Sequence, residues 1–126
     1  MKITYKNALD SLPALKGLMS ARGLCGTSQI RLVRLWKELS EHVKTLTETD
    51  TILVREYGEI GDGGIVSFFD ESKKDEFLRR REEMFSEMVE VTPITVKAED
   101  AFFMASSPEM LILLERLIDF EEENRS

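Results

Sequence analysis

The single histidine, His42, is the side chain most readily given a chemical role, because an imidazole can bind or release a proton near neutral pH. Glu38 precedes it by four residues, and that spacing places both side chains on the same side of a helix. Such a pair could serve as a general acid–base dyad. A solvated ion pair on a helix surface requires no further catalytic residue, and the sequence favours that simpler interpretation.

Cys25, the single cysteine, lies in a loop between Gly23 and Gly26, close to Arg22. A neighbouring cation can make a thiol reactive, but no second catalytic residue is identifiable beside it, so an ordinary half-buried thiol is favoured. One cysteine cannot form an internal disulfide, and one cysteine with one histidine cannot build a tetrahedral zinc site without carboxylates. We therefore expect no cofactor and no structural metal.

Basic residues follow one side of the segment around positions 31 to 44 and could bind an anion such as a phosphate. The candidate anion-binding residues are Arg31, Arg34, Lys37 and Arg55, with Lys44 on the same side as the first three. The alternative is pairing with acidic residues, because residues 1–58 carry a charge of +3 and residues 59–126 a charge of −10. The charge balance favours this alternative. The net charge of −7 makes direct nucleic-acid binding unfavourable.

Sequence motifs of common enzyme classes are missing. Gly61, Gly63 and Gly64 lack the lysine and the strand-to-helix context of a phosphate-binding loop, and the arginines at 79–81 are spread around a helix rather than gathered in one patch. We therefore predict a protein that is not an enzyme. The first residues lack the apolar region of a signal peptide, and no run approaches about 20 apolar residues, so we expect a cytoplasmic protein without membrane insertion.

The pattern of apolar and turn-forming residues predicts a single domain, 1–126, that is mainly α with a small β element (an α+β fold). The predicted helices cover about 6–20, 28–57, 71–88 and 107–121. Thr27 or Ser28 is the expected N-cap of the long helix, Gly58 its C′ residue, and Asp70 or Ser72 the cap of the next. A short strand or extended run is expected at 65–69, and the apolar residues around Pro93 suggest an edge strand there.

The long predicted helix carries apolar residues at alternating spacings of four and three, which is a heptad seam. The seam consists of Leu32, Trp36, Leu39, Val43, Leu46, Leu53 and Tyr57, with Asp50 as its polar interruption. A helix of this length measures about 45 Å at about 1.5 Å per residue, which exceeds what a small domain buries alone. The seam is therefore the predicted interface for self-assembly or a partner, and the helix at 71–88 the predicted antiparallel partner in a long helical hairpin.

Four short stretches resemble a family of phage and prophage proteins of unknown function. They are the opening Met1-Lys2-Ile3-Thr4-Tyr5-Lys6-Asn7-Ala8-Leu9, the Glu56-Tyr57-Gly58-Glu59 that closes the long helix, Glu90 between Val89 and Val91, and Ser107-Pro108-Glu109-Met110-Leu111. The resemblance implies a tailed-phage or prophage origin and a helical hairpin fold. It implies no catalytic residues.

Three functional hypotheses follow. The leading one is a non-enzymatic phage accessory protein in the host cytoplasm that forms homo-oligomers and binds a host or phage protein, for example as an inhibitor of a host defence system. The second is a virion or tail-assembly component. The third is a protein that sequesters nucleotides, with Arg31, Arg34 or Arg55 holding the phosphate between subunits.

Overall fold

The structure, a computed structural model, describes residues 1–20, 23–97, 100 and 117–120. In chain order the helices and strands are β1 Lys2–Thr4, α1 Tyr5–Met19, α2 Gly26–Tyr57, β2 Gly58–Ile60, β3 Val66–Phe68, α3 Lys74–Phe85, β4 Met88–Glu90, β5 Ile94–Val96 and β6 Ile118–Phe120. Short 3-10 turns occupy Asp62–Gly64 and Glu71–Lys73. The chain is mostly helical with three two-stranded sheets in its described part, which confirms the predicted class of a mainly α fold with a small β component.

Helix α1 begins at an N-cap and carries a proline in its interior. The Thr4 side chain accepts a hydrogen bond from the Asn7 N–H at 3.1 Å, which satisfies one of the free amides at the start of the helix. Pro13 removes one backbone donor, and its exposed ring lies on the solvent side. The opposite side of α1, which includes Leu15 and Leu18, is buried against α2.

Helix α2 starts two residues earlier than predicted. Its N-cap is Cys25, which makes no side-chain capping bond, so the predicted cap at Thr27 or Ser28 is wrong. A buried acid far along the chain, Asp100, accepts the hydrogen bond from the Cys25 N–H at 3.1 Å instead. The 32 residues of α2 correspond to a length of about 48 Å.

Gly58 follows α2, but not as the left-handed C′ residue that the sequence suggested. Its backbone is extended (φ −173°), so the chain passes directly from helix into β2. A Cβ atom here would lie 2.4 Å from the Ser67 carbonyl oxygen, because β3 pairs closely with β2 at this point. Glycine is therefore required by space. Left-handed glycines occur at the hairpin tip, at Gly63 (φ 73°) and Gly64 (φ 79°).

Helix α3 is shorter than predicted at both ends. Asp70 caps the preceding 3-10 turn by accepting from the Ser72 N–H, and α3 itself starts at Lys74. It ends at Phe85, because Met88–Glu90 is strand β4, which pairs antiparallel with β1. The predicted continuation of the helix to residue 88 is therefore wrong. Met88 belongs to a strand because the backbone of β1 pairs with it.

Pro93 lies between β4 and β5, so the single edge strand expected around it is two strands in the structure. Strand β5 pairs in parallel with β6, with Ile94 opposite Ile118. The predicted helix at 107–121 is wrong at 118–120, which form β6, while 107–116 and 121 lie outside the described residues. Apolar periodicity in a short run cannot distinguish a buried helix from a buried strand, and here the long-range pairing with β5 decides.

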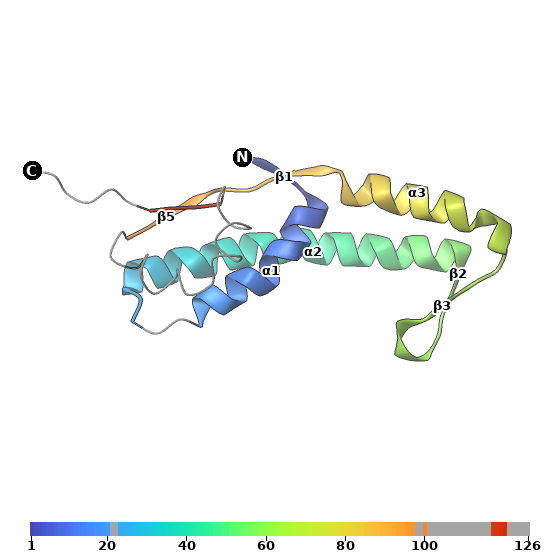
Figure 1. Cartoon of the computed structure of the whole chain (residues 1–126), viewed down its shortest axis with the longest axis horizontal. Helices are drawn as coiled ribbons and strands as arrows, with labels where there is room; N and C mark the ends of the chain where they lie inside the picture. The colour runs from blue at the N-terminus through green and yellow to red at the C-terminus, as the bar shows by residue number, and fades with distance from the viewer. Residues whose placement is uncertain (21–22, 98–99, 101–116, 121–126) are drawn as a thin grey trace, which may run out of the picture.

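Two apolar clusters lie along α2. The first joins the amino-terminal half of α2 to α1, β1 and the strands β4 to β6, with Leu32, Leu35 and Leu39 contributed by α2. The second joins Leu53, Val54 and Tyr57 of α2 to Phe77 of α3. Helix α3 runs back beside the carboxy-terminal half of α2, and the hairpin β2–β3 projects from that end of the molecule (Figure 1).

Candidate functional site

The heptad seam is largely buried within the single chain. Leu32, Leu39, Leu46, Leu53 and Tyr57 are buried, while Trp36 and Val43 are half-buried and pack against the first cluster. Helix α1 and the strands cover the first part of the seam, and α3 with the hairpin covers the last part. The five buried side chains are therefore not available to a partner in this conformation, whereas Trp36 and Val43 remain partly accessible.

The polar interruption of the seam is explained by α3. Asp50 receives two hydrogen bonds from the Arg81 guanidinium, at 2.9 and 3.0 Å, and the Arg81 side chain also lies over the Phe85 ring. Arg80 bonds Glu56 at 2.8 Å and the Tyr57 hydroxyl at 3.0 Å, and these two partners raise the pKa of its guanidinium. The sequence suggested that acidic residues of the second half would bind basic residues of the first. The observed ion pairs are the opposite, because Arg80 and Arg81 of the acidic half bind acidic residues of α2.

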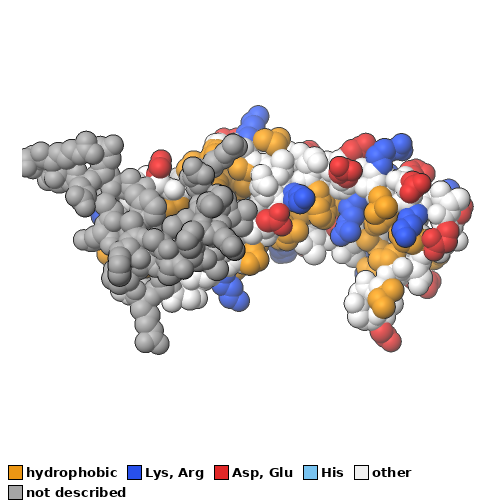
Figure 2. Space-filling model, viewed as in Figure 1, with side chains coloured by type: hydrophobic (Ala, Val, Ile, Leu, Met, Phe, Trp, Pro, Cys, Tyr) orange, Lys and Arg blue, Asp and Glu red, His pale blue; other side chains and the backbone are white. Residues whose placement is uncertain are grey.

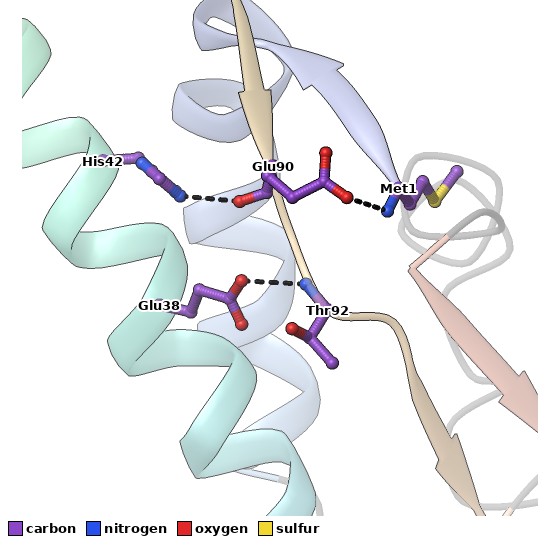
Figure 3. Close-up of polar contacts among 5 residues, drawn as sticks. All are labelled: Met1, Glu38, His42, Glu90 and Thr92. Atoms are coloured by element: carbon purple, nitrogen blue, oxygen red, sulfur yellow. Dashed lines mark hydrogen bonds and ion pairs between the residues drawn. The ribbon is translucent and has the colours of Figure 1, made fainter.

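Polar side chains of α2 bind the backbone of the segment that contains β4 and β5 (Figure 3). The Glu38 carboxylate accepts from the Thr92 N–H at 2.8 Å, and the Glu90 carbonyl accepts from His42 Nε2 at 2.9 Å. One end of the segment is further held by Arg31, whose guanidinium donates to the Thr95 carbonyl at 2.6 Å. These three bonds fix an irregular stretch around Pro93 to the long helix.

The bonding pattern assigns His42 and Glu38 a structural role. A carbonyl oxygen can only accept, so Nε2 of His42 must carry its proton, and Glu38 binds a backbone amide instead of the imidazole. The edge of the His42 ring is packed against Tyr5, with ring centroids 6.4 Å apart. The acid–base dyad considered from the sequence is therefore not formed.

Glu90 also connects the amino-terminal strand to this segment (Figure 3). Its side chain accepts from the Met1 ammonium at 2.9 Å, and this bond lowers the pKa of the exposed Glu90 carboxyl. The Val91 N–H donates to the Met1 carbonyl at 2.8 Å, which extends the β1–β4 pairing by one more contact.

A groove of 640 Å³ lies between α2 and the Thr92–Thr95 stretch. It is lined by Arg31, Arg34, Leu35, Glu38, Thr92, Pro93, Ile94 and Thr95. Two of the predicted anion-binding residues, Arg31 and Arg34, thus lie in one groove. Lys37 is exposed one turn further along α2. Arg55 follows Arg31 by 24 residues, or about 36 Å of helix, so a single site in one chain cannot contain both.

Cys25 is bound to a buried carboxylate. Its thiol donates to Asp100 at 3.2 Å, and its N–H to the other oxygen of the same carboxylate. Burial by itself raises the pKa of Asp100, but hydrogen bonds from the Ser28 hydroxyl and from the Cys25 N–H and thiol outweigh it and lower the pKa below its ordinary value. Arg22, the expected neighbour of Cys25, lies outside the described residues. Asp100 thus holds Cys25, the N-cap residue of α2, through two hydrogen bonds.

Exposed apolar side chains lie on the β2–β3 hairpin and at the residue after it, while Ile52, in the carboxy-terminal half of α2, is 69% exposed as well. Ile60, Ile65 and Phe69 are 46%, 70% and 66% exposed. On the face shown in Figure 2, hydrophobic side chains at this end of the molecule lie among Lys, Arg, Asp and Glu side chains. Sequence reasoning assigned no role to the hairpin, although the apolar residues that flank Asp62-Gly63-Gly64 are a readable signal for one.

In residues 1–20, 23–97, 100 and 117–120, no three His, Cys, Asp or Glu side chains are grouped so that they could hold a metal ion. Within the same ranges, no helix combines the length and the apolar character needed to cross a bilayer.

Comparison with known proteins found no matching family model, no matching curated protein and no matching solved structure. The phage origin therefore stays a prediction that rests on the sequence resemblance alone.

Three residues of the two polar sites carried no sequence signal. Asp100, Thr92 and Thr95 each contact a residue of α2 or its N-cap that lies more than 50 positions away in the sequence, so no local pattern indicates the contact.

Proposed function

We propose that this protein acts by binding protein rather than by catalysis, and that the β2–β3 hairpin is its binding surface. The observation that carries the proposal is the exposure of Ile65 and Phe69 on one face of a projecting hairpin. Exposed apolar groups that gather in one place are typical of interaction surfaces. The use of His42 and Glu38 as backbone ligands supports the non-enzymatic part.

The hairpin has one face that is already used and one that is open. Val66 and Phe68 pack on the second cluster, with the Phe68 and Phe77 rings 5.3 Å apart. Side chains alternate between the two faces of a strand, so Phe69 follows Phe68 on the opposite side. The hairpin is therefore anchored through the face that carries Val66 and Phe68, together with Ile60, which lies directly opposite Val66. It presents the other face, which carries Ile65 and Phe69.

The backbone edges of the hairpin are also open. The bonds from Phe69 N–H to the Tyr57 carbonyl and from Gly61 N–H to the Ile65 carbonyl mark hydrogen-bonded pairs of an antiparallel ladder. Bonding alternates along such a ladder, so the backbone groups of Ile60 and Val66 point outward. Among the described strands none pairs with either edge, and a two-stranded ribbon is only marginally stable alone.

A second copy of this chain is the partner that we propose for the hairpin. Two hairpins related by a twofold axis can pair edge to edge into a four-stranded sheet, which covers the apolar side chains and satisfies the outward backbone groups. This places the predicted homo-oligomer on the hairpin in place of the heptad seam. The same surface, once paired, is a platform for the host or phage protein of the leading hypothesis.

Light scattering on the purified protein tests the proposal. Wild type is expected to be a dimer at micromolar concentration, and the double variant Ile65→Ser, Phe69→Ser a monomer with an unchanged circular dichroism spectrum. The matched control is Ile30→Ser, because Ile30 is 56% exposed but lies near the other end of α2. The control should remain a dimer.

Two results would contradict this function. A monomeric wild type excludes self-association, and a dimer that survives the double substitution places the interface elsewhere. The phage setting has its own test, which is mass spectrometry of purified particles and of infected lysate. A non-structural accessory protein is expected in the lysate and absent from the particles, whereas its presence in the particles would favour the virion hypothesis.

A further inference from the structure

We infer that the groove between α2 and β5 is a binding site for a small organic phosphate of nucleotide size. The inference is independent of the hairpin, because Arg34 and Tyr57 are 23 residues apart on α2, or about 35 Å. It rests on the volume of the groove, the placement of Arg34, an outward backbone N–H at Thr95 and the apolar residues between them.

Arg34 is the charged group that the fold leaves for a ligand. It is exposed at the groove, and neither a hydrogen bond nor an ion pair engages its guanidinium in the described structure. Arg31 precedes it by three residues, so the two side chains are neighbours on one side of α2. A guanidinium binds phosphate oxygens through two parallel N–H groups, which makes this pair of arginines suited to an anion.

Thr95 supplies the directional donor. Ile94 donates to the Leu117 carbonyl and lies opposite Ile118 in the parallel β5–β6 pair. Alternate residues of a strand face alternate edges, so the N–H and the carbonyl of Thr95 both point away from β6. The bond from Arg31 to the Thr95 carbonyl confirms this direction, and the N–H beside it points into the same space.

The remaining lining sets the kind of ligand. A volume of 640 Å³ lies within the range of small-molecule sites, roughly 300–1,000 Å³, and exceeds what an inorganic phosphate fills. Leu35, Pro93 and Ile94 offer an apolar floor for a ring. Glu38 uses one carboxylate oxygen for the Thr92 N–H, which leaves the other able to accept from an amino group. These features fit a phosphate attached to an apolar ring that carries an amino group.

A titration of the ¹⁵N-labelled chain, followed by NMR, tests the site. The probes are adenosine 5′-monophosphate, inorganic phosphate, acetate and adenosine. Adenosine 5′-monophosphate is expected to shift the Thr95 amide resonance in a saturable way, inorganic phosphate to do so at higher concentration, and acetate and adenosine to leave it unchanged. Arg34→Ala should weaken adenosine 5′-monophosphate binding by about tenfold or more, because a hydrogen bond to a charged group is lost.

Arg55→Ala is the matched control, since Arg55 is an exposed arginine of the same helix outside the groove. Its affinity for the nucleotide should equal that of wild type. Equal weakening by both substitutions would show attraction to net charge only and would overturn the site. A Thr95 amide that responds to no probe would overturn it as well, and an equal response to acetate and phosphate would overturn the assignment to phosphates.

Discussion

Replacing Gly58 by alanine puts a Cβ atom 2.4 Å from the Ser67 carbonyl oxygen, which is a backbone atom that cannot rotate away. The backbone at Gly58 is extended, a conformation that alanine adopts readily, so the whole effect arises from this collision. To relieve it, β3 must move away from β2 by more than half an ångström at the point where both strands leave the second apolar cluster.

The cost can be placed within limits. Inserting a methyl group into a closely packed position typically destabilises a protein by about 1–3 kcal/mol, and we expect Gly58→Ala to fall in that range. The displacement also weakens the nearby bond from the Phe69 N–H to the Tyr57 carbonyl, which is 2.9 Å long. The loss should therefore be concentrated in the hairpin and the second cluster, while the first cluster remains protected.

Equilibrium urea unfolding measures the total change, and amide hydrogen exchange locates it. Gly58→Ala is expected to accelerate exchange at Phe69 and Gly61, with little change in the first cluster. Two other glycines serve as controls: a Cβ at Gly61 comes no closer than 3.4 Å to the Ile65 carbonyl oxygen, and a Cβ at Gly26 meets no atom within 4 Å. If Gly58→Ala is as stable as these two variants, the close approach of β2 and β3 is not a packing constraint.

Three further perturbations test the polar contacts of α2. A double-mutant cycle with Asp50→Ala and Arg81→Ala should give a coupling of about 1 kcal/mol that shrinks with added salt, since the pair is bidentate but partly exposed; additive effects would show that the two side chains do not interact. Asp100→Ala should destabilise by about 1–3 kcal/mol, because it leaves the N–H of Cys25, the N-cap of α2, without its acceptor. The pKa of Asp100 is lowered on folding, so its contribution to the free energy of unfolding is complete above the unfolded pKa near 3.8 and declines as the pH falls through the folded pKa. Urea unfolding from about pH 6 to pH 2 should show this decline in wild type and a shallower one in Asp100→Ala. His42→Ala should cost about 1 kcal/mol and change the ¹³C shift of the Glu90 carbonyl, whereas an unchanged shift would contradict the bond between them.

Part of the fold could be predicted because local signals specify it. Asp70 caps the turn that leads into α3, and the alternation of apolar residues from Leu32 to Tyr57 marks one side of a long helix that ends before Gly58. Capping bonds and helical periodicity connect residues at most a few positions apart. The sequence therefore contains everything that these features require.

The candidate sites followed a different rule. Arg31 and Arg34 were selected correctly as neighbours on α2, but the groove exists only because Thr92–Thr95 lies beside them. Arg55 was grouped with them by residue type, although the length of the helix separates them. The Cys25–Asp100 contact joins residues 75 positions apart, and no local pattern announces it.

The sequence by itself thus determined the presence of α1, α2 and α3, the end of α2 before Gly58, the turn at the hairpin tip, and the apolar side of α2 that had to be covered. Only the tertiary structure decided what covers it: α1 and the strands at one end, and α3 at the other, in place of a second subunit. The physical reason is that an apolar stripe requires burial but carries no information about the partner that provides it. That choice placed most of the seam inside the chain, and it left exposed the hairpin and the groove beside β5, the two surfaces that we propose for binding.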